Sequence, residues 1–193
     1  MPSWRPPRGG EGAFVDDGGL VIRPFAPADG PAVRALYITV NRLLAPEHLK
    51  TAFETYIVQS LAEEMDRVED YYRARDGGFW VALEGEALRG MFGLERIAPD
   101  AMELRRMYVD PADRRRGIAR RLLAFAETTC RARGIARLEL STSELQKAAL
   151  AFYRQAGYRL LREEVAEAAS NKTLGGGIRR YYFEKALKAG AGS

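Results

Sequence analysis

The chain has 193 residues, of which 47% are apolar and 29% are charged, and it carries a net charge of +4. This length suits one domain with a sizeable core, and no apolar run approaches the roughly 20 residues that span a bilayer. A single cysteine and a single histidine exclude a disulfide framework and a soft-metal site. We therefore expect no metal, no membrane partner and a reducing, cytoplasmic setting.

The basic excess consists almost entirely of arginine, a bias that genomic base composition can produce. The sequence contains no RNA-binding motif, no zinc-ligand spacing and no basic repeat. We therefore expect no nucleic-acid partner.

The N-terminal part of the chain predicts a tail, a strand and a helix. Residues 1–18 are rich in glycine, proline and charge, which predicts a disordered tail, while the domain is expected over residues 19–188 and residues 189–193 should fray. A short strand is predicted at residues 20–25. Asp29 is a candidate N-cap for a helix that runs through Leu43.

A longer helical segment is predicted after Pro46. His48, at its start, is expected to be a surface or capping residue rather than a catalytic one. Apolar side chains recur along the segment at three- and four-residue spacing, which predicts a buried stripe. Its members are Phe53, Ile57, Leu61, Met65, Val68 and Tyr72.

The pattern changes to strand alternation at Gly78. Strands are predicted at residues 79–83, 87–97 and 101–109, and their short connections make them antiparallel. The period of two places one set of side chains on the same face of the third strand. This set is Glu103, Arg105, Met107 and Val109.

The C-terminal part predicts a helix from Ile118 to Arg133-Gly134, with Cys130 on its buried face. A strand at residues 136–141 should pair in parallel with the strand before the helix. Thr142-Ser143 is expected to cap a helix over residues 145–155. Two further strands, residues 158–165 and 179–187, are joined by a flexible loop over residues 166–178.

A loop rich in arginine and glycine separates Val109 from the helix that begins at Ile118. Gly117 allows the backbone to approach a ligand closely, and a helix N-terminus offers unpaired amides and a positive dipole end. Arg114, Arg115 and Arg116 add positive charge. The loop lacks the Gly-Lys-Ser/Thr ending of a P-loop and the three spaced glycines of a dinucleotide site. The pattern predicts a phosphate or pyrophosphate site.

The run Arg114-Arg115-Arg116-Gly117-Ile118-Ala119 resembles the Gln/Arg-x-x-Gly-x-Gly/Ala motif with which the GNAT superfamily of N-acyltransferases binds acyl-CoA. The preceding strand ELRRMYVDP and the later run AFYRQAGY stand at the spacing of that family. The resemblance implies a mixed α/β GNAT fold from about residue 20 to 187. This fold has a mostly antiparallel, twisted central sheet with a splayed parallel strand pair and helices on both faces.

The same resemblance implies acetyl-CoA as co-substrate, bound in the gap beyond Val109. Its pantetheine would pair with the backbone of Met107, Tyr108 and Val109. Gln146 stands where the family often has asparagine, so it can offer a longer-armed hydrogen bond. The pyrophosphate would be held by the amides of Arg115, Arg116, Gly117, Ile118 and Ala119, with Arg114 and Arg120 nearby.

The resemblance also implies direct attack by an amine in a ternary complex, which requires no enzyme nucleophile. Tyr153 matches the general acid that many family members place beside the cofactor sulfur; the alternative is a packing role. Glu103 stands where some members carry a general base. Because Arg105 and Arg106 would lower the pKa of its carboxyl, a structural ion pair is an equal alternative.

The expected reaction is acetyl transfer to the primary amine of a small molecule or amino-acid derivative. A protein N-terminal or lysine acetyltransferase and a non-catalytic acyl-CoA-binding module are alternatives, and a homodimer is left open. The acceptor groove is expected between the helical segment 42–72, the strand near Glu95 and Arg96, and the loop 166–178. None of these carries a motif that identifies the acceptor.

Overall fold

The structure is a computed structural model that describes residues 14–15 and 18–187 of the chain. The predicted frayed end and most of the predicted N-terminal tail lie outside these residues. Phe14 and Val15 are an exception, because they form strand β1 (Phe14–Val15) and pair antiparallel with β2 (Leu20–Pro24). These two residues of the predicted tail belong to the sheet.

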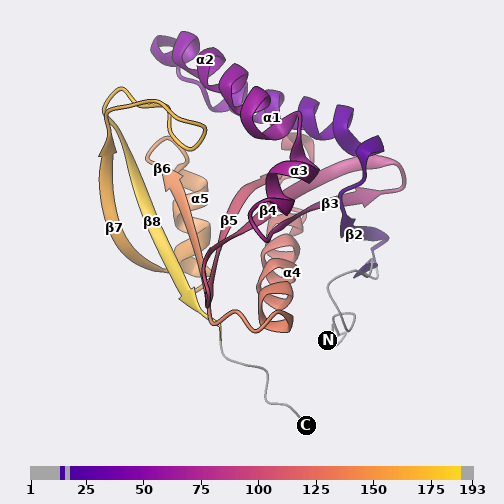
Figure 1. Ribbon diagram of the computed structural model, residues 1–193. Helices are drawn as coiled ribbons and strands as arrows, with labels where there is room; N and C mark the ends of the chain where they lie inside the picture. Colours follow the sequence, from indigo (N-terminus) through magenta and orange to yellow (C-terminus); the bar gives the residue numbers. More distant parts are fainter. Residues whose placement is uncertain (1–13, 16–17, 188–193) are drawn as a thin grey trace.

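The described strands form one twisted sheet in the order β1-β2-β3-β4-β5-β6-β8-β7 (Figure 1). All neighbours pair antiparallel except β5 and β6, which are parallel. This confirms the predicted mostly antiparallel sheet with one parallel pair. Beyond β2, the strands are β3 (Gly78–Glu84), β4 (Ala87–Ala98), β5 (Ala101–Val109), β6 (Arg137–Ser143), β7 (Arg159–Ala166) and β8 (Ile178–Ala186).

Helices cover both faces of the sheet, as predicted (Figure 1). On one face lie α1 (Gly30–Leu44), α2 (Lys50–Ser60) and α3 (Val68–Arg73), which share a buried cluster with the sheet. On the other lie α4 (Ile118–Ala132) and α5 (Lys147–Gln155) with a second cluster. None of the described helices has both the length and the apolar character needed to cross a membrane.

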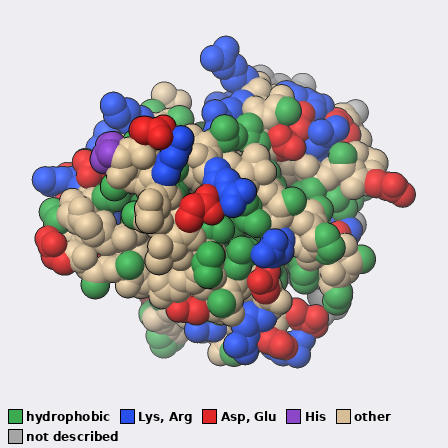
Figure 2. Space-filling view, turned by 90° about the horizontal axis from the view of Figure 1, so that it is seen from above, with side chains coloured by type: hydrophobic (Ala, Val, Ile, Leu, Met, Phe, Trp, Pro, Cys, Tyr) green, Lys and Arg blue, Asp and Glu red, His purple; other side chains and the backbone are tan. Residues whose placement is uncertain are grey.

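The predicted apolar stripe after Pro46 is buried along its whole length, from Phe53 to Tyr72. It is not one helix, however, because a π-helical turn at Leu61–Met65 separates α2 from α3. A π turn adds a residue to the helical repeat and changes which side chain faces inward. Here it accompanies the complete burial of Glu64. His48 lies in a short turn before α2 and is exposed; the single histidine is visible on the surface in Figure 2.

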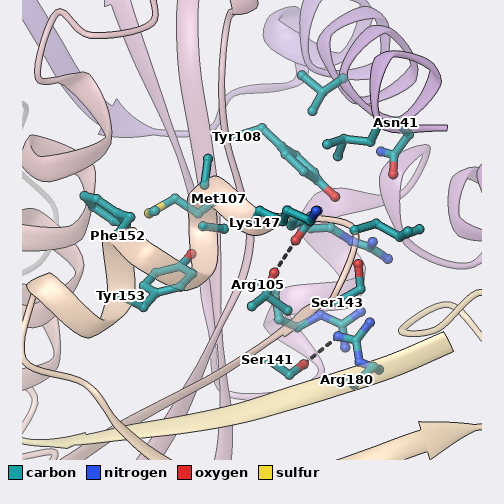
Figure 3. A pocket seen from close by; sticks show the side chains of 18 of the residues that line it. Asn41, Arg105, Met107, Tyr108, Ser141, Ser143, Lys147, Phe152, Tyr153 and Arg180 are labelled. Atoms are coloured by element: carbon teal, nitrogen blue, oxygen red, sulfur yellow. Dashed lines mark hydrogen bonds between the residues drawn. The ribbon is translucent and has the colours of Figure 1, made fainter. Parts of the chain in front are cut away.

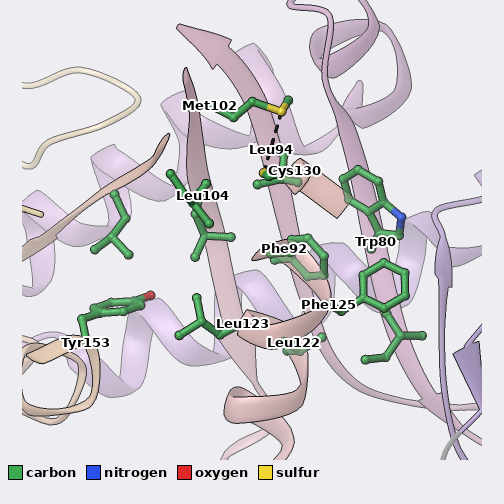
Figure 4. Close-up of a cluster of buried hydrophobic side chains, with 14 of the residues drawn as sticks. Trp80, Phe92, Leu94, Met102, Leu104, Leu122, Leu123, Phe125, Cys130 and Tyr153 are labelled. Carbon is green, nitrogen blue, oxygen red and sulfur yellow. Dashed lines mark hydrogen bonds between the residues drawn. The ribbon is translucent and has the colours of Figure 1, made fainter. Parts of the chain in front are cut away.

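Aromatic stacking and aliphatic packing form the core between the sheet and α4 (Figure 4). Trp80 stacks on Phe92 with ring centroids 5.2 Å apart, and Phe125 contacts both rings from α4. Cys130 is fully buried beside Met102. Burial raises the pKa of its thiol to about 12, which keeps the sulfur protonated and agrees with the predicted packing role.

Candidate active site

A cavity of about 740 Å³ opens where β5 and β6 separate. The two strands pair only from Ala101 to Leu104 on β5 and from Arg137 to Leu140 on β6. Beyond these residues, Met107–Val109 of β5 and Ser141–Ser143 of β6 line opposite walls of the cavity. Met107, Tyr108 and Val109 therefore have a strand edge toward the cavity that β6 does not pair with.

A β-bulge at Arg106 lies just beyond the point where β5 leaves β6, and it corrects one prediction. Arg106 has a positive φ of 51°, and one extra residue of β5 stands opposite β4 between Met91 and Gly93. The alternation therefore shifts at the bulge. Arg105 and Arg106 both reach Glu64, whereas Met107 and Val109 pack against the α4 cluster. The predicted single face containing Glu103, Arg105, Met107 and Val109 is wrong.

The arginine-glycine loop stands at the N-terminus of α4, beside the cavity. Gly117 has a φ of 78° and Arg115 a φ of 67°, so the chain makes a left-handed turn directly before the helix. The side chains of Arg114, Arg115 and Ala119 line the cavity. The first amides of α4 have no carbonyl partner within the helix, so the loop has the features of an anion site.

The neighbouring residues of this loop contribute less to the cavity wall. Arg116 forms ion pairs with Glu84 and Asp113, so its guanidinium holds the loop against β3. The hydrogen bond from Arg116 helps to lower the pKa of the Asp113 carboxyl. Ile118 is buried in the core and Arg120 is exposed outside the lining. Ile118 can therefore act on a ligand only through its backbone amide.

Gln146 directly precedes α5 and lines the cavity. Its side-chain oxygen accepts a hydrogen bond from the Thr142 hydroxyl. Thr142 and Ser143 extend β6 rather than cap the helix, because β8 pairs with them as far as Arg180. The predicted cap is therefore wrong, and α5 starts two residues later than predicted, at Lys147.

Tyr153 projects from α5 into the side of the cavity that Met107 and Phe152 also line (Figure 3). Its ring contacts Phe152, Tyr158 and Phe183. Burial raises the pKa of its phenol, so the hydroxyl stays protonated at neutral pH. Among the described residues, no side chain or backbone group forms a hydrogen bond with this hydroxyl.

Glu103 lies at the cavity and forms an ion pair with Lys172 of the loop between β7 and β8. Nζ of Lys172 lies 2.6 Å from Oε2 of Glu103 and 2.8 Å from Oε1 of Glu95. Of the predicted acceptor walls, the helical segment contributes Leu44, Phe53 and Tyr56, and the loop contributes Lys172 to Leu174. The predicted wall near Glu95 and Arg96 is wrong, because neither residue lines the cavity: Arg96 pairs with Asp76, and Glu95 reaches the site only through its ion pair with Lys172.

The sequence of this chain matches one protein family over more than half its length, residues 45–158: the acetyltransferase (GNAT) family. The chain belongs to the GNAT family. It is therefore an acyl-CoA-dependent acetyltransferase, as the arginine-glycine loop and the AFYRQAGY run predicted. The fold of this GNAT protein also agrees with the family, in the splayed parallel pair and in the helices on both faces of the sheet.

Two relatives and one solved structure illustrate the match. This GNAT protein is 30% identical to the uncharacterized N-acetyltransferase YjgM of Escherichia coli, over 72% of the chain and 81% of the relative. It is 28% identical to human N-acetyltransferase 8, over 57% of the chain and 51% of that relative. The PaiA N-acetyltransferase of Thermoplasma acidophilum, solved in complex with coenzyme A, superposes with a TM-score of 0.68 at 19% identity, over 86% of this chain and 98% of that one.

Sequence reasoning missed a buried polar cluster beneath the acceptor side of this acetyltransferase. Glu64 is fully buried and accepts hydrogen bonds from Arg105 at 2.6 Å and from Arg106 at 2.7 and 3.1 Å. Tyr72 donates to the same carboxylate at 2.6 Å. The absence of a side chain on Gly93 makes room for the Tyr72 ring, because a Cβ there would lie 2.3 Å from it. The only sequence signal was a glutamate within the apolar stripe.

Tyr56 connects this cluster to the cavity, which it lines. Its hydroxyl accepts a hydrogen bond of 2.6 Å from Nη1 of Arg106. Burial by itself raises the pKa of the phenol, but the charge and the hydrogen bond of Arg106, with a further contribution from Arg180, lower it below its usual value. The acceptor side therefore presents a phenol that loses its proton more readily than an ordinary tyrosine.

Proposed function

We propose that this acetyltransferase moves the acetyl group of acetyl-CoA to the primary amine of a small molecule or amino-acid derivative. The observation that carries the proposal is the arrangement of the cavity, which runs from the arginine-glycine loop past Tyr153 to a polar pocket under α1 and α2. A single opening in the sheet can thus hold a nucleotide end, a thioester and an amine in one line.

The arginine-glycine loop is proposed to bind the pyrophosphate. Amides of the first turn of α4 and the guanidinium groups of Arg114 and Arg115 suit phosphate oxygens. The unpaired β5 edge at Met107–Val109 suits the amide groups of the pantetheine arm, and the Gln146 side chain lines the cavity from the β6 side, beside Thr142. Coenzyme A bound to the structurally similar PaiA protein supports this assignment.

Tyr153 is proposed to act as the general acid. The amine nitrogen attacks the thioester carbonyl carbon, the new C–N bond forms, and the C–S bond breaks as its electron pair passes to sulfur. The Tyr153 hydroxyl supplies the proton that converts the thiolate to free thiol. Its raised pKa and its lack of a partner among the described residues support this role, because the proton is present and is not committed to another acceptor.

Removal of the proton from the amine is assigned to Glu103, directly or through a water. Lys172 forms an ion pair with this carboxylate, and a charged acceptor amine can take the place of the Lys172 ammonium. The alternative is that the pair is purely structural. Glu103→Gln lowers kcat at neutral pH if the carboxylate is the base, whereas loss of a structural pair lowers stability with kcat retained.

A small acceptor is favoured over a protein because the loop 166–178 covers the acceptor side. The carbonyl of Asn171 accepts a hydrogen bond of 2.5 Å from Arg106, and Lys172 is held by two carboxylates. These contacts fasten the loop across the pocket that a bulky acceptor would have to enter.

The test is thiol release from acetyl-CoA with a panel of small amines and of peptides that carry either a free N-terminus or a lysine. Turnover of small amines supports the proposal. Turnover of peptides alone replaces it with protein acetylation, and tight coenzyme A binding in calorimetry without turnover of any amine replaces it with a binding module.

A further inference from the structure

Arg180 occupies the acceptor side of the cavity, on β8. Strand register places it opposite Ser143 of β6, and Tyr182 opposite Ser141. Because Phe183 and Leu140 face the α4 and α5 side, Arg180, Ser141 and Ser143 face the other side, toward α1 and α2. All three residues line the cavity, and Figure 3 shows them together on the wall away from Tyr153.

The Arg180 guanidinium is incompletely satisfied by the protein. Its Nη2 donates a hydrogen bond of 2.6 Å to Oγ of Ser141. Its Nε is buried and has no hydrogen-bond partner. Glu164 stands opposite Arg180 in the β7–β8 register but forms its ion pair, of 2.6 Å, with Arg162. Arg180 thus forms no ion pair with any described residue, although leaving a half-buried guanidinium without a counter-charge is unfavourable.

The carboxylates around the acceptor side are all paired with other cations. Glu64 pairs with Arg105 and Arg106, Glu95 pairs with Arg105 and Lys172, and Glu103 pairs with Lys172. Glu95 also lies 3.7 Å from Nε of Arg75, so each of these three carboxylates is already paired, and together they stand against four cations. Arg180 adds a further positive charge on this side. Glu103 is the only carboxylate among the described residues that line the cavity, and it is already paired with Lys172.

We infer that the acceptor carries a carboxylate as well as its amine, and that Arg180 binds this carboxylate with help from the Ser141 and Ser143 hydroxyls. A guanidinium with free N–H groups presents two parallel donors that match the two oxygens of a carboxylate. This inference rests on the proposed acetyl transfer to small amines and narrows its substrate class to amino acids and other amino-carboxylic acids.

The test uses matched sets of acceptors: an α-, β- or γ-amino acid, its carboxamide and its decarboxylated amine, each assayed for thiol release with saturating acetyl-CoA. The amino acid should be the preferred member of its set. Arg180→Gln should raise KM for that acceptor by about ten- to a hundredfold, the loss of one charge-assisted pair, and leave KM for acetyl-CoA unchanged. Arg180→Lys should restore part of the preference for the amino acid, since lysine keeps the positive charge but lacks the two parallel N–H donors of the guanidinium.

Arg179→Gln is the matched control, because Arg179 is the adjacent residue, is exposed and pairs with Glu163 at 2.9 Å. The Arg179→Gln variant should keep the wild-type preference for amino acids over their carboxamides and amines. The inference would be overturned if the protein acetylated carboxamides and decarboxylated amines as efficiently as amino acids. It would also be overturned if the preference for amino acids survived Arg180→Gln. In both cases the proposed function would still stand. Absence of turnover with every set, in wild-type protein that binds coenzyme A, would remove the proposed function and this inference with it.

Discussion

Arg106 holds Glu64 through two nitrogens: Nε lies 3.1 Å from Oε1 and Nη2 lies 2.7 Å from Oε2. The two residues are 42 positions apart in the chain, one in the π-helical turn after α2 and the other at the bulge of β5. This contact fastens the helices that cover the acceptor side to the strand that forms the opening. A positive φ at Arg106 costs conformational energy, and the ion pair offsets it.

Replacing Glu64 by Gln should destabilise the protein by about 3–5 kcal/mol, because Arg106 would lose its buried counter-charge and Arg105 would keep only Glu95. Urea unfolding followed by circular dichroism measures the change. Glu63→Gln is the control: the adjacent carboxylate is exposed and bonds only Gln59 among the described residues, so its loss should cost well under about 1 kcal/mol. Equal stability of the two variants would contradict the structural role of Glu64.

Glu64 should also give stability a characteristic acid dependence. Burial raises the pKa of this carboxyl, but the charges and hydrogen bonds of Arg106 and Arg105 outweigh burial and hold it below the ordinary value of 4.5. Its contribution is therefore complete above pH 4.5 and is lost as the pH falls through the lower folded-state pKa. Below this pH the unfolding free energy of wild type should fall more steeply than that of Glu64→Gln. If the two free energies fall in parallel with pH, Glu64 does not cause the acid dependence.

Replacing Gly117 by Ala should weaken coenzyme A binding on the order of tenfold, because the methyl group and the altered turn would disturb the amides that receive the phosphates. Gly134→Ala provides a matched control at the other end of α4. Both glycines have positive φ, 78° and 72°, and a Cβ at either meets no atom within 4 Å. Both variants should lose about 1–2 kcal/mol of stability from the left-handed conformation. Calorimetry should detect weaker binding only in Gly117→Ala.

Replacing Tyr153 by Phe should lower kcat by about a hundred- to ten-thousandfold and leave both KM values within a few fold, because the lost proton donor acts only in the transition state. Stability should change little, since the hydroxyl has no partner among the described residues. Tyr158→Phe is the contrast: its hydroxyl bonds Glu127 at 3.2 Å in the core, so that variant should lose stability and keep kcat. An unchanged rate in Tyr153→Phe would leave Tyr153 only its packing role.

Local patterns in the sequence determined the elements and the position of the anion loop. Two-residue alternation predicted β3, β4 and β5, and the apolar stripe predicted the burial of Phe53 through Tyr72. A glycine and three arginines directly before an amphipathic helix predicted the loop at Gly117, and the structure gives this glycine a positive φ. These features follow from interactions between residues a few positions apart, which a single sequence displays directly.

Only the tertiary structure decided how β5 and the acceptor side are arranged. The sequence predicted one face for Glu103 through Val109, but the bulge at Arg106 divides that face. The strict two-residue alternation assumed for the whole strand does not hold across the bulge, where the core-facing side chains step from Leu104 to Met107. The pairings of Glu64 with Arg105 and of Lys172 with Glu103 join residues 41 and 69 positions apart. Such pairings, and the unpaired state of Arg180, depend on which strands and helices meet in space. The charges and spacings along the chain do not specify which strands and helices come into contact.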